Sequence, residues 1–488
     1  MSNQPAKPIR TRMAPSPTGF LHIGTARTAL FNFLFTRHES GVFVLRIEDT
    51  DLERSEKRFE DDIINGLHWL GITWDEGPIR QSERLDIYET HLRQLLDSGK
   101  AFHCTHDPAS LEAEKKEQMT SKSPLRHICT DRDTKRKEGI IRLRNDATGD
   151  IMFNDIIRGN IMVKAEELGD FSLAKNPKTP LFNFANVVDD YDMQISHVIR
   201  GEDHIPNTPR QILIQKALGF PDLAYAHLPL ILGQDRSKMS KRDGATSIGE
   251  YRALGYLPEA LANFIALMGW HATGDREIFS LNELVQEFSL ERVQKSGAVF
   301  DIEKLNWLNA EYIRKLPLPD LTMHLVPYLI DAGLITVEGD RYRTKDGRTV
   351  DQEYLNRISA LEAPRLKRLS DIAERVAFFF DTPQYEADLL SWKGKQDFQT
   401  IRQNIDEVEK IVRNIESSNF SPEDLKEVIM PFAEAKGRGE VLWPLRALLS
   451  GKEASPDPFD LMATLGKDET LARIQRAKSI PQIQNAIL

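Results

Sequence analysis

The feature that most constrains the fold of this chain is one segment near its beginning, residues 10–51, which reads RTRMAPSPTGFLHIGTARTALFNFLFTRHESGVFVLRIEDTD. A short strand leads into a turn that contains Pro15, Pro17 and Gly19. Apolar residues at helical spacing then predict an amphipathic helix, and a second strand over 42–47 follows. Polar residues after both strands would share one edge of a parallel sheet, where ligands bind in open α/β sheets.

The start of the predicted helix is suited to bind an anion. Gly19 and Gly24 allow the backbone to approach a ligand closely, and the first turn of a helix offers free N–H groups and the positive end of a dipole. His22 adds a side-chain donor at the same place. Because a His-x-Gly tripeptide at a helix start is more often an ordinary cap, a triphosphate site requires support from elsewhere in the chain.

A second motif, SKMSKR at 237–242, supplies that support. Alone it is typical of a basic, solvated loop. Together with PSPTG and HIG it resembles the two signatures of class I aminoacyl-tRNA synthetases. The surrounding sequence is similar to bacterial-type glutamyl-tRNA synthetases in the stretches APSPTG, HIGTARTALFN, LRIEDTD, NVVDD, HVIRGEDH and SKMSKRDGA. The resemblance covers residues 10–315 closely and the remainder more loosely.

The resemblance implies an α/β fold, a Rossmann-type doubly wound parallel sheet with an inserted α+β domain, followed by all-α C-terminal domains. The change of pattern after residue 100, to short strands and a charged helix, agrees with an insertion. The expected segments are the first half of the catalytic domain (1–98), the inserted acceptor-binding domain (99–182), the second half of the catalytic domain (183–236), a stem-contact region with the SKMSKR loop (237–322) and two helical anticodon-binding domains (323–378 and 379–488).

Several elements are expected within the first segments. Residues 73–78 are expected as a loop, after which Ser82 caps a helix. Strands over 184–188 and 195–199 are expected on either side of an acidic turn at Asp189 and Asp190. One more strand is expected over 228–232, just before the SKMSKR loop.

The C-terminal part of the chain has a helical pattern from about residue 320. Its periodic apolar residues predict a helix over 401–415. A capping-box sequence with proline at the first helical position predicts another helix at Ser421, and 461–474 is expected as the last one. The resemblance identifies these helices with anticodon binding, although periodicity alone fits any all-α interaction domain. Arg365 matches a family position associated with the last anticodon base, and the alternative is a solvated basic face.

The resemblance also implies a reaction and its site. Glutamate would attack the α-phosphorus of ATP, and the terminal ribose of tRNA(Glu) would then attack the adenylate. The residues matched to glutamate binding are Arg12, Ser16, Glu48, Phe182, Asn186 and Arg200. Those matched to ATP binding are His22, Gly24, Thr25, Asp203, Lys238 and Lys241, of which His22, Gly24, Lys238 and Lys241 would be catalytic. Mg²⁺ would be bound mainly through ATP.

The side-chain chemistry fits these roles. Arginine binds a carboxylate through a bidentate fork, and Glu48 would pair with the amino group of the substrate. One departure concerns Phe182, because many relatives have tyrosine there. Taken singly, an arginine or glutamate at the end of a strand is more often part of a structural salt bridge.

A second candidate site lies in the predicted insertion, where both cysteines of the chain occur. Cys104 and His106 form one pair, and His127 and Cys129 form another. Two cysteines and two histidines are a standard tetrahedral zinc set, which would be closed and structural. Some relatives carry zinc here with a cysteine where this chain has His106. Short patterns of this kind also arise by coincidence.

Composition limits the remaining possibilities. The chain has 488 residues, a formal net charge of −10 and two cysteines, which exclude a disulfide framework. An acidic chain is not an indiscriminate nucleic-acid binder, although one basic face suffices for one RNA. We expect no membrane span, a cytoplasmic protein and a monomer.

Other functions remain open from the sequence. The nearest is glutaminyl-tRNA synthetase, which differs in its pocket and anticodon region. A nucleotidyltransferase that acts on a small molecule would have no use for the helical C-terminal part. A non-catalytic tRNA-binding paralogue would not need His22, Gly24, Lys238 and Lys241.

Overall fold

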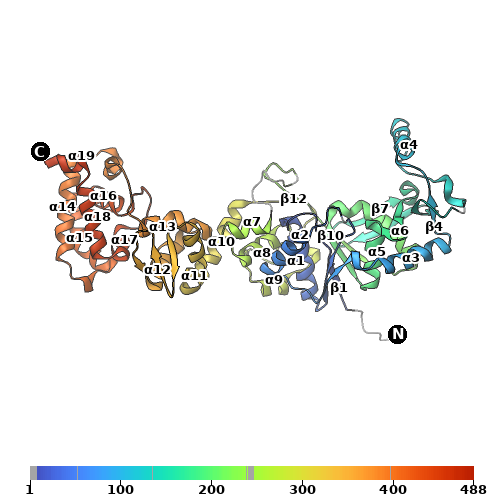
Figure 1. Cartoon of the computed structure of the whole chain (residues 1–488), viewed down its shortest axis with the longest axis horizontal. Coiled ribbons are helices and arrows are strands. Elements are labelled where there is room, and N and C mark those ends of the chain that lie inside the picture. Colours follow the sequence, from blue (N-terminus) through green and yellow to red (C-terminus); the bar gives the residue numbers. More distant parts are fainter. Residues whose placement is uncertain are drawn as a thin grey trace. The chain divides into compact units, whose positions relative to one another are not determined.

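The computed structural model forms two compact units (Figure 1). It describes residues 8–51, 53–134, 136–237, 239, 247–395 and 397–487. Unit 1 comprises Met1–Ala253 and Leu257–Leu305, and unit 2 comprises Leu254–Tyr256 and Asn306–Leu488. The finer division into six segments stays a prediction.

Unit 1 is built on two neighbouring sheets of mostly parallel strands, and the strand order runs outward in opposite directions from the line where they meet. Strand β1 pairs in parallel with β2, which pairs with β3, and β10 pairs in parallel with β11. The two halves meet where the Ser196 N–H donates to the Arg10 carbonyl at 2.9 Å. The strands are β1 (Arg10–Met13), β2 (Val42–Ile47), β3 (Glu76–Arg80), β10 (His197–Gly201) and β11 (Ala224–Leu228). This is the expected Rossmann-type arrangement, and the reversal creates a crevice at the carboxyl ends of β1 and β10.

Helix α1 (Ile23–His38) lies against β1, β2 and β10 and is covered by two further helices, α8 (Pro258–Leu267) and α9 (Leu281–Glu287). Buried residues therefore occur on all its sides, and the expectation of an amphipathic helix is wrong for this reason. A second group of helices packs together elsewhere in the unit: α3 (Leu85–Asp97), α5 (Phe182–Asp192) and α6 (Thr208–Leu218). Helices α2 (Lys57–Trp69) and α7 (Ile248–Ala253) also contact each other.

The segment predicted as an insertion contains a four-stranded antiparallel sheet, in the order β4-β5-β8-β9. Its strands are β4 (Ala101–Cys104), β5 (Ile140–Leu143), β8 (Ser172–Asn176) and β9 (Thr179–Pro180). The charged helix α4 (Pro108–Thr120) begins where Asp107 caps the Ser110 N–H. Strand β6 (Asp150–Asp155) pairs in parallel with β11, while β7 (Gly159–Lys164) forms an antiparallel hairpin with it. The predicted insertion thus forms the antiparallel β4-β5-β8-β9 sheet and also adds β6 and β7 to the sheet of β10 and β11.

Several expected elements of unit 1 are wrong. Residues 184–188 belong to α5. The expectation failed because a short run of neighbouring buried apolar residues is compatible with a buried helix as well as with a strand. Asp189 and Asp190 therefore lie on a helix. The strand expected over 228–232 is two strands, β11 and β12 (Ile231–Leu232), separated at Pro229, which has no N–H for a ladder. Strand β12 pairs with β13 (Ala298–Val299).

Two smaller differences occur around β3. That strand covers part of the 73–78 segment expected as a loop. Helix α3 has Arg84 as its N-cap, whereas Ser82 donates its N–H and hydroxyl to the carboxylate of Asp49.

Unit 2 is mainly helical, as predicted, and α10 (Ile302–Lys315) leads the chain into it. The capping box at Ser421 is confirmed, and Gly466, with φ of 82°, divides the last predicted helix into α17 (Pro458–Leu465) and α18 (Lys467–Lys478). The sequence pattern missed a small antiparallel sheet of β14 (Ile335–Glu338), β15 (Arg341–Thr344) and β16 (Thr349–Val350). The helices that follow α10 are α11 (Leu318–Asp331), α12 (Gln352–Glu362), α13 (Ile372–Phe380), α14 (Phe398–Asn414), α15 (Pro422–Lys436), α16 (Arg438–Ser450), α17 (Pro458–Leu465), α18 (Lys467–Lys478) and α19 (Pro481–Gln484).

No helix in the described parts of either unit combines the length and apolar content needed to cross a bilayer.

Candidate active site

A cavity of about 920 Å³ opens at the crevice between the carboxyl ends of β1 and β10. Its size is in the range of small-molecule sites. All the predicted glutamate- and ATP-binding residues that the structure describes line it: Arg12, Ser16, His22, Gly24, Thr25, Glu48, Phe182, Asn186, Arg200 and Asp203. Lys238 and Lys241 lie outside the described residues, although Met239 between them lines the cavity.

Two arginines are anchored in the wall of the cavity. Arg12 donates from Nε to Asp190 Oδ1 at 3.1 Å, and Arg200 donates from Nη2 to Thr208 Oγ1 at 2.7 Å. Three guanidinium nitrogens, Nη1 and Nη2 of Arg12 and Nη1 of Arg200, have no hydrogen-bond partner among the described residues. Burial, together with the nearby charge of Arg12, lowers the pKa of Arg200 to about 10. Two cationic forks are therefore available to an anionic ligand.

Arg46 on β2 is the centre of the polar network behind these side chains. It is fully buried, and it donates to Asp190 Oδ1 at 2.7 Å, to Asn186 Oδ1 at 2.6 Å and to Glu48 Oε1 at 3.1 Å. Asp189 Oδ2 lies 3.7 Å from its Nε. Arg46 thus fixes two of the predicted pocket residues, Glu48 and Asn186.

The carboxylates around Arg46 differ in pKa. Burial raises the pKa of Glu48 above its usual value, although Arg46 and Arg12 oppose the shift. Burial also acts on Asp190, but there Arg12 and Arg46 outweigh it and the pKa is lowered. A cation bound next to Glu48 would keep that carboxylate ionised.

The start of α1 forms the adjoining part of the cavity wall. His22 is the N-cap, and its Nδ1 accepts the Thr25 N–H at 3.2 Å, while Thr25 Oγ1 lies 2.8 Å from its Nε2. A Cβ atom on Gly24 would lie 3.1 Å from two atoms of the imidazole. Glycine at this position therefore allows the ring to fold over the first turn of the helix, next to its N–H groups.

Aromatic rings line the cavity beside Arg200. Phe182 stacks on His204, with ring centroids 5.6 Å apart. Burial, with the charge of Arg200, lowers the pKa of His204 to about 4, so this ring is neutral at physiological pH. Asp203 is the second residue after β10 and lies close to Gly201, because a Cβ atom on Gly201 would be 2.5 Å from Asp203 Oδ1.

The sequence patterns missed three buried residues of the site. Arg46 and His227 look like ordinary strand positions, since their partners lie far away in sequence. Arg27 lies within α1, lines the cavity and donates to the carbonyls of Pro229 and Met268. An arginine in the first half of a largely apolar helix was the one signal available for it.

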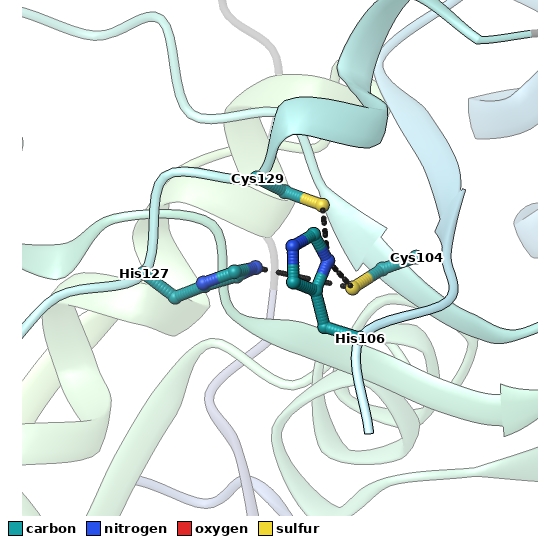
Figure 2. Close-up of side chains that lie close together, drawn as sticks. All are labelled: Cys104, His106, His127 and Cys129. Atoms are coloured by element: carbon teal, nitrogen blue, oxygen red, sulfur yellow. Dashed lines mark hydrogen bonds between the residues drawn. The ribbon is translucent and has the colours of Figure 1, made fainter. Parts of the chain in front are cut away.

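The two Cys/His pairs converge at the second candidate site, where one potential ligand atom from each residue lies within 4.8 Å of the others (Figure 2). His106 Nδ1 is 3.5 Å from the Sγ of Cys104 and of Cys129, and His127 Nε2 is 3.9 Å from Cys104 Sγ. His127 Nδ1 lies 2.6 Å from Glu114 Oε2, which would orient the ring. Burial raises the pKa of Cys129 to about 12 in the absence of a cation.

In unit 2, Arg365 follows α12 and is partly exposed. Its Nη1 donates to Glu362 Oε1 at 3.2 Å, and Arg375 donates to the other oxygen of this buried carboxylate at 2.6 Å. Arg365 is therefore held at one end rather than fully solvated.

Comparison with known proteins identifies the class. The family model of the catalytic domain of class I tRNA synthetases (E and Q) matches residues 8–307, and that of an anticodon binding domain matches residues 320–478. The chain therefore belongs to the class I tRNA synthetases of the glutamate and glutamine group.

The relatives lie on the glutamate side of this group. The chain is 42% identical to glutamate–tRNA ligase 1 of Caldanaerobacter subterraneus, over 96% of this chain and 97% of that protein. It is 44% identical to the glutamate–tRNA ligase of Picosynechococcus, over 92% and 94% respectively. The crystal structure of a glutamate tRNA ligase from Elizabethkingia meningosepticum, in complex with its amino acid, superposes with a TM-score of 0.85 at 33% identity, covering 97% of this chain and all of that one.

Proposed function

We propose that this chain is a glutamate–tRNA ligase, which joins L-glutamate to tRNA(Glu) through a glutamyl adenylate. The observation that carries the proposal is the cavity at the β1/β10 crevice, where two anchored arginines and one buried glutamate face a helix start suited to phosphates. Class I synthetases use ATP with Mg²⁺, and the family match extends this requirement to the chain.

The chemistry needs positioning rather than a protein nucleophile. An oxygen of the α-carboxylate of glutamate attacks the α-phosphorus of ATP, and pyrophosphate leaves with the P–O bond electrons. The terminal ribose hydroxyl of the tRNA then attacks the carbonyl carbon of the adenylate, and AMP leaves. Both steps develop negative charge on phosphate oxygens, so fixed cations and N–H donors supply the catalysis.

Each charge of glutamate has a counterpart in the wall. The free forks of Arg12 and Arg200 would bind its carboxylates, and Glu48 would bind its ammonium group. Asn186 and Ser16 would add polar contacts, and Phe182 would line the aliphatic part of the substrate. Glutamine lacks the charge that a second arginine would neutralise, and this favours glutamate over the glutaminyl alternative.

The nucleotide would lie along the start of α1. His22, Gly24 and Thr25 would hold the phosphates with side-chain and backbone donors, and Asp203 would contact the nucleotide from the turn after β10. Lys238 and Lys241 would neutralise the pyrophosphate as it leaves. A non-catalytic paralogue would not require this set.

The test is ATP–pyrophosphate exchange with glutamate or glutamine, each with and without unfractionated tRNA. We expect exchange that depends on glutamate, and a requirement for tRNA would show that the RNA completes the site. Exchange with glutamine alone would contradict the assignment. No exchange with either amino acid, with or without tRNA, would favour a non-catalytic tRNA-binding protein.

We also propose that unit 2 binds the anticodon and that Arg365 contacts its last base. The support is the match of residues 320–478 to an anticodon binding domain and the anchoring of Arg365 on Glu362. Replacing Arg365 by Gln should weaken discrimination between tRNA(Glu) isoacceptors and tRNA(Gln), measured as the ratio of kcat/KM values.

We further propose that the protein acts in the cytoplasm as a monomer. Gel filtration tests the monomeric state.

We propose structural zinc at Cys104, His106, His127 and Cys129. The donor set and its spacing fit a tetrahedral ion, because one ligand atom from each residue lies within 4.8 Å of the others. Metal analysis of protein purified without chelator should give one zinc per chain, and the Cys104→Ser/Cys129→Ser variant should give none. Absence of zinc from the unaltered protein would end this proposal.

A further inference from the structure

Two buried residues lie behind Arg200 and lead from the core to the cavity. His227 on β11 and Asp155 at the end of β6 have fully buried side chains. His227 Nδ1 is 2.6 Å from Asp155 Oδ2, and Arg200 Nε donates to His227 Nε2 at 3.2 Å. The three side chains therefore form one row, Asp155–His227–Arg200, across the β6–β11–β10 part of the sheet.

The hydrogen bonds assign the protons of this row. A carboxylate only accepts hydrogen bonds, so the proton of His227 lies on Nδ1, facing Asp155. Nε2 is then unprotonated and can accept from the guanidinium of Arg200. Asp155 is itself held in place, since its Oδ1 accepts the backbone N–H groups of Ile157 at 3.0 Å and Arg158 at 2.7 Å.

This arrangement determines which edge of Arg200 faces the cavity. His227 holds Nε, and Thr208 Oγ1 holds Nη2 while lying 3.1 Å from His227 Nε2. Turning the guanidinium would break both bonds inside the core. Nη1 is the nitrogen left without a partner among the described residues, and it belongs to a side chain that lines the cavity.

We propose that His227 is a positioning residue for Arg200, and that Asp155 fixes the tautomer of His227 required for this. The recognition of the glutamate carboxylate would then depend on two side chains that never touch the substrate. The inference deepens the proposed function and rests on its assignment of Arg200 to glutamate binding.

The first test replaces His227 by Leu or Gln and measures ATP–pyrophosphate exchange at varied glutamate and at varied ATP. We expect His227→Leu to raise the KM for glutamate by roughly 10- to 100-fold, the scale of one hydrogen bond to a charged group, and to leave the KM for ATP within about 2-fold. His227→Gln retains a carbonyl acceptor and should recover part of the loss. Equal rises in both KM values, or no difference between Leu and Gln, would overturn the proposal.

The second test, Asp155→Asn, retains the shape of the row. The amide oxygen would stay with the backbone N–H groups of Ile157 and Arg158. The amide NH₂ would then face His227, where it loses the hydrogen bond from the backbone N–H of His227 and forces the ring proton onto Nε2, against Arg200. We expect a rise in the glutamate KM similar to that of His227→Leu, and ¹⁵N NMR of the ring should show the changed tautomer. A changed tautomer with an unchanged glutamate KM would contradict the proposed role.

Two further variants make the outcome unambiguous. His197→Leu removes another partly buried histidine, at the opposite end of β10 and outside the cavity, and should leave the glutamate KM unchanged. Arg200→Lys tests the proposed function directly. If Arg200→Lys leaves the glutamate KM unchanged, the assignment of Arg200 fails; if it raises the KM while folded His227→Leu does not, the positioning role alone fails.

Discussion

At the scale of single residues, the site depends on a buried cation that no ligand is expected to touch. Arg46 compensates three carboxylates, Glu48, Asp189 and Asp190, within the core of unit 1. Buried charges are tolerated only when they are paired, and removing one member leaves the others unpaired. Arg46 therefore links the stability of unit 1 to the geometry of the glutamate pocket.

We predict that Arg46→Met lowers the free energy of unfolding of unit 1 by about 3–5 kcal/mol, the usual result of breaking a buried ion pair. Chemical denaturation measures the change. The matched control is Arg54→Met, whose partner Asp51 is also exposed to solvent, and which should leave the stability essentially unchanged. Equal stability of the two variants would contradict the central role of Arg46.

A prediction for the nucleotide part of the site concerns Gly24. In Gly24→Ala the new methyl group would meet the His22 ring at 3.1 Å and displace it from the first turn of α1. We expect adenylate formation to slow by roughly 10- to 100-fold, because a small misplacement of a catalytic group has effects of this size. Gly249→Ala in α7 is the control, since the nearest atom to its new methyl group, Asp62 Oδ1, would be 3.8 Å away. Wild-type exchange by Gly24→Ala would show that the ring can move freely.

At the residue scale, the motifs named residues that the structure brings together, and their roles stay predictions, whereas local patterns could not show partners that are distant in the sequence. Ten of the predicted pocket residues line one cavity, and they come from β1, β10, the start of α1, α5 and the turns after the strands. Arg46 could not be predicted, since its bond to Asp190 spans 144 positions. Nothing in the local pattern distinguishes it from an arginine on a solvated strand.

At the scale of elements, the SKMSKR motif carries the clearest catalytic prediction. Lys241 lies outside the described residues, and its role rests on the motif. Lys241→Ala should slow adenylate formation by roughly 100- to 1,000-fold, the scale of one lost charge contact in a transition state. The rate of ATP–pyrophosphate exchange measures the change, and the control is Lys345→Ala, on an exposed turn of unit 2. Equal rates for both variants would remove the SKMSKR motif from the chemistry.

Element types were predictable where periodicity was long and ambiguous where apolar runs were short. The helix α14 was expected within one to a few residues because its buried positions recur regularly, as Ile401, Ile405, Val408 and Val412 do. The stretch over 184–188 has no such regularity. Because α5 is buried on several sides, neighbouring residues there are apolar, and such a run is also typical of a buried strand. The β14–β16 sheet was missed because its outward-facing residues are mostly polar or charged.

At the scale of the whole molecule, the two units differ in their content of histidine. Burial lowers the pKa of His197, His204 and His227 in unit 1, and the pKa of His204 falls to about 4. Unit 2 contains only His324, which is exposed. A histidine with a lowered pKa stabilises the fold above its unfolded pKa, about 6.5, and this contribution is lost as the pH falls toward the folded value.

We therefore predict that unit 1 loses stability between pH 7 and pH 5 while unit 2 retains it. Hydrogen exchange read peptide by peptide, and corrected for the intrinsic pH dependence of exchange, separates the units. Carboxylates of lowered pKa, such as Asp190 in unit 1 and Asp406 in unit 2, should weaken both units only below about pH 4. An equal loss in both units between pH 7 and pH 5 would contradict this account.

We propose that the β1/β10 cavity recognises glutamate through all its charges. A crystal structure of the protein with L-glutamate tests it most directly. We expect the two carboxylates at the free guanidinium edges of Arg12 and Arg200, with the ammonium group beside Glu48. Glutamate bound with neither carboxylate on these arginines, or outside this cavity, would contradict it.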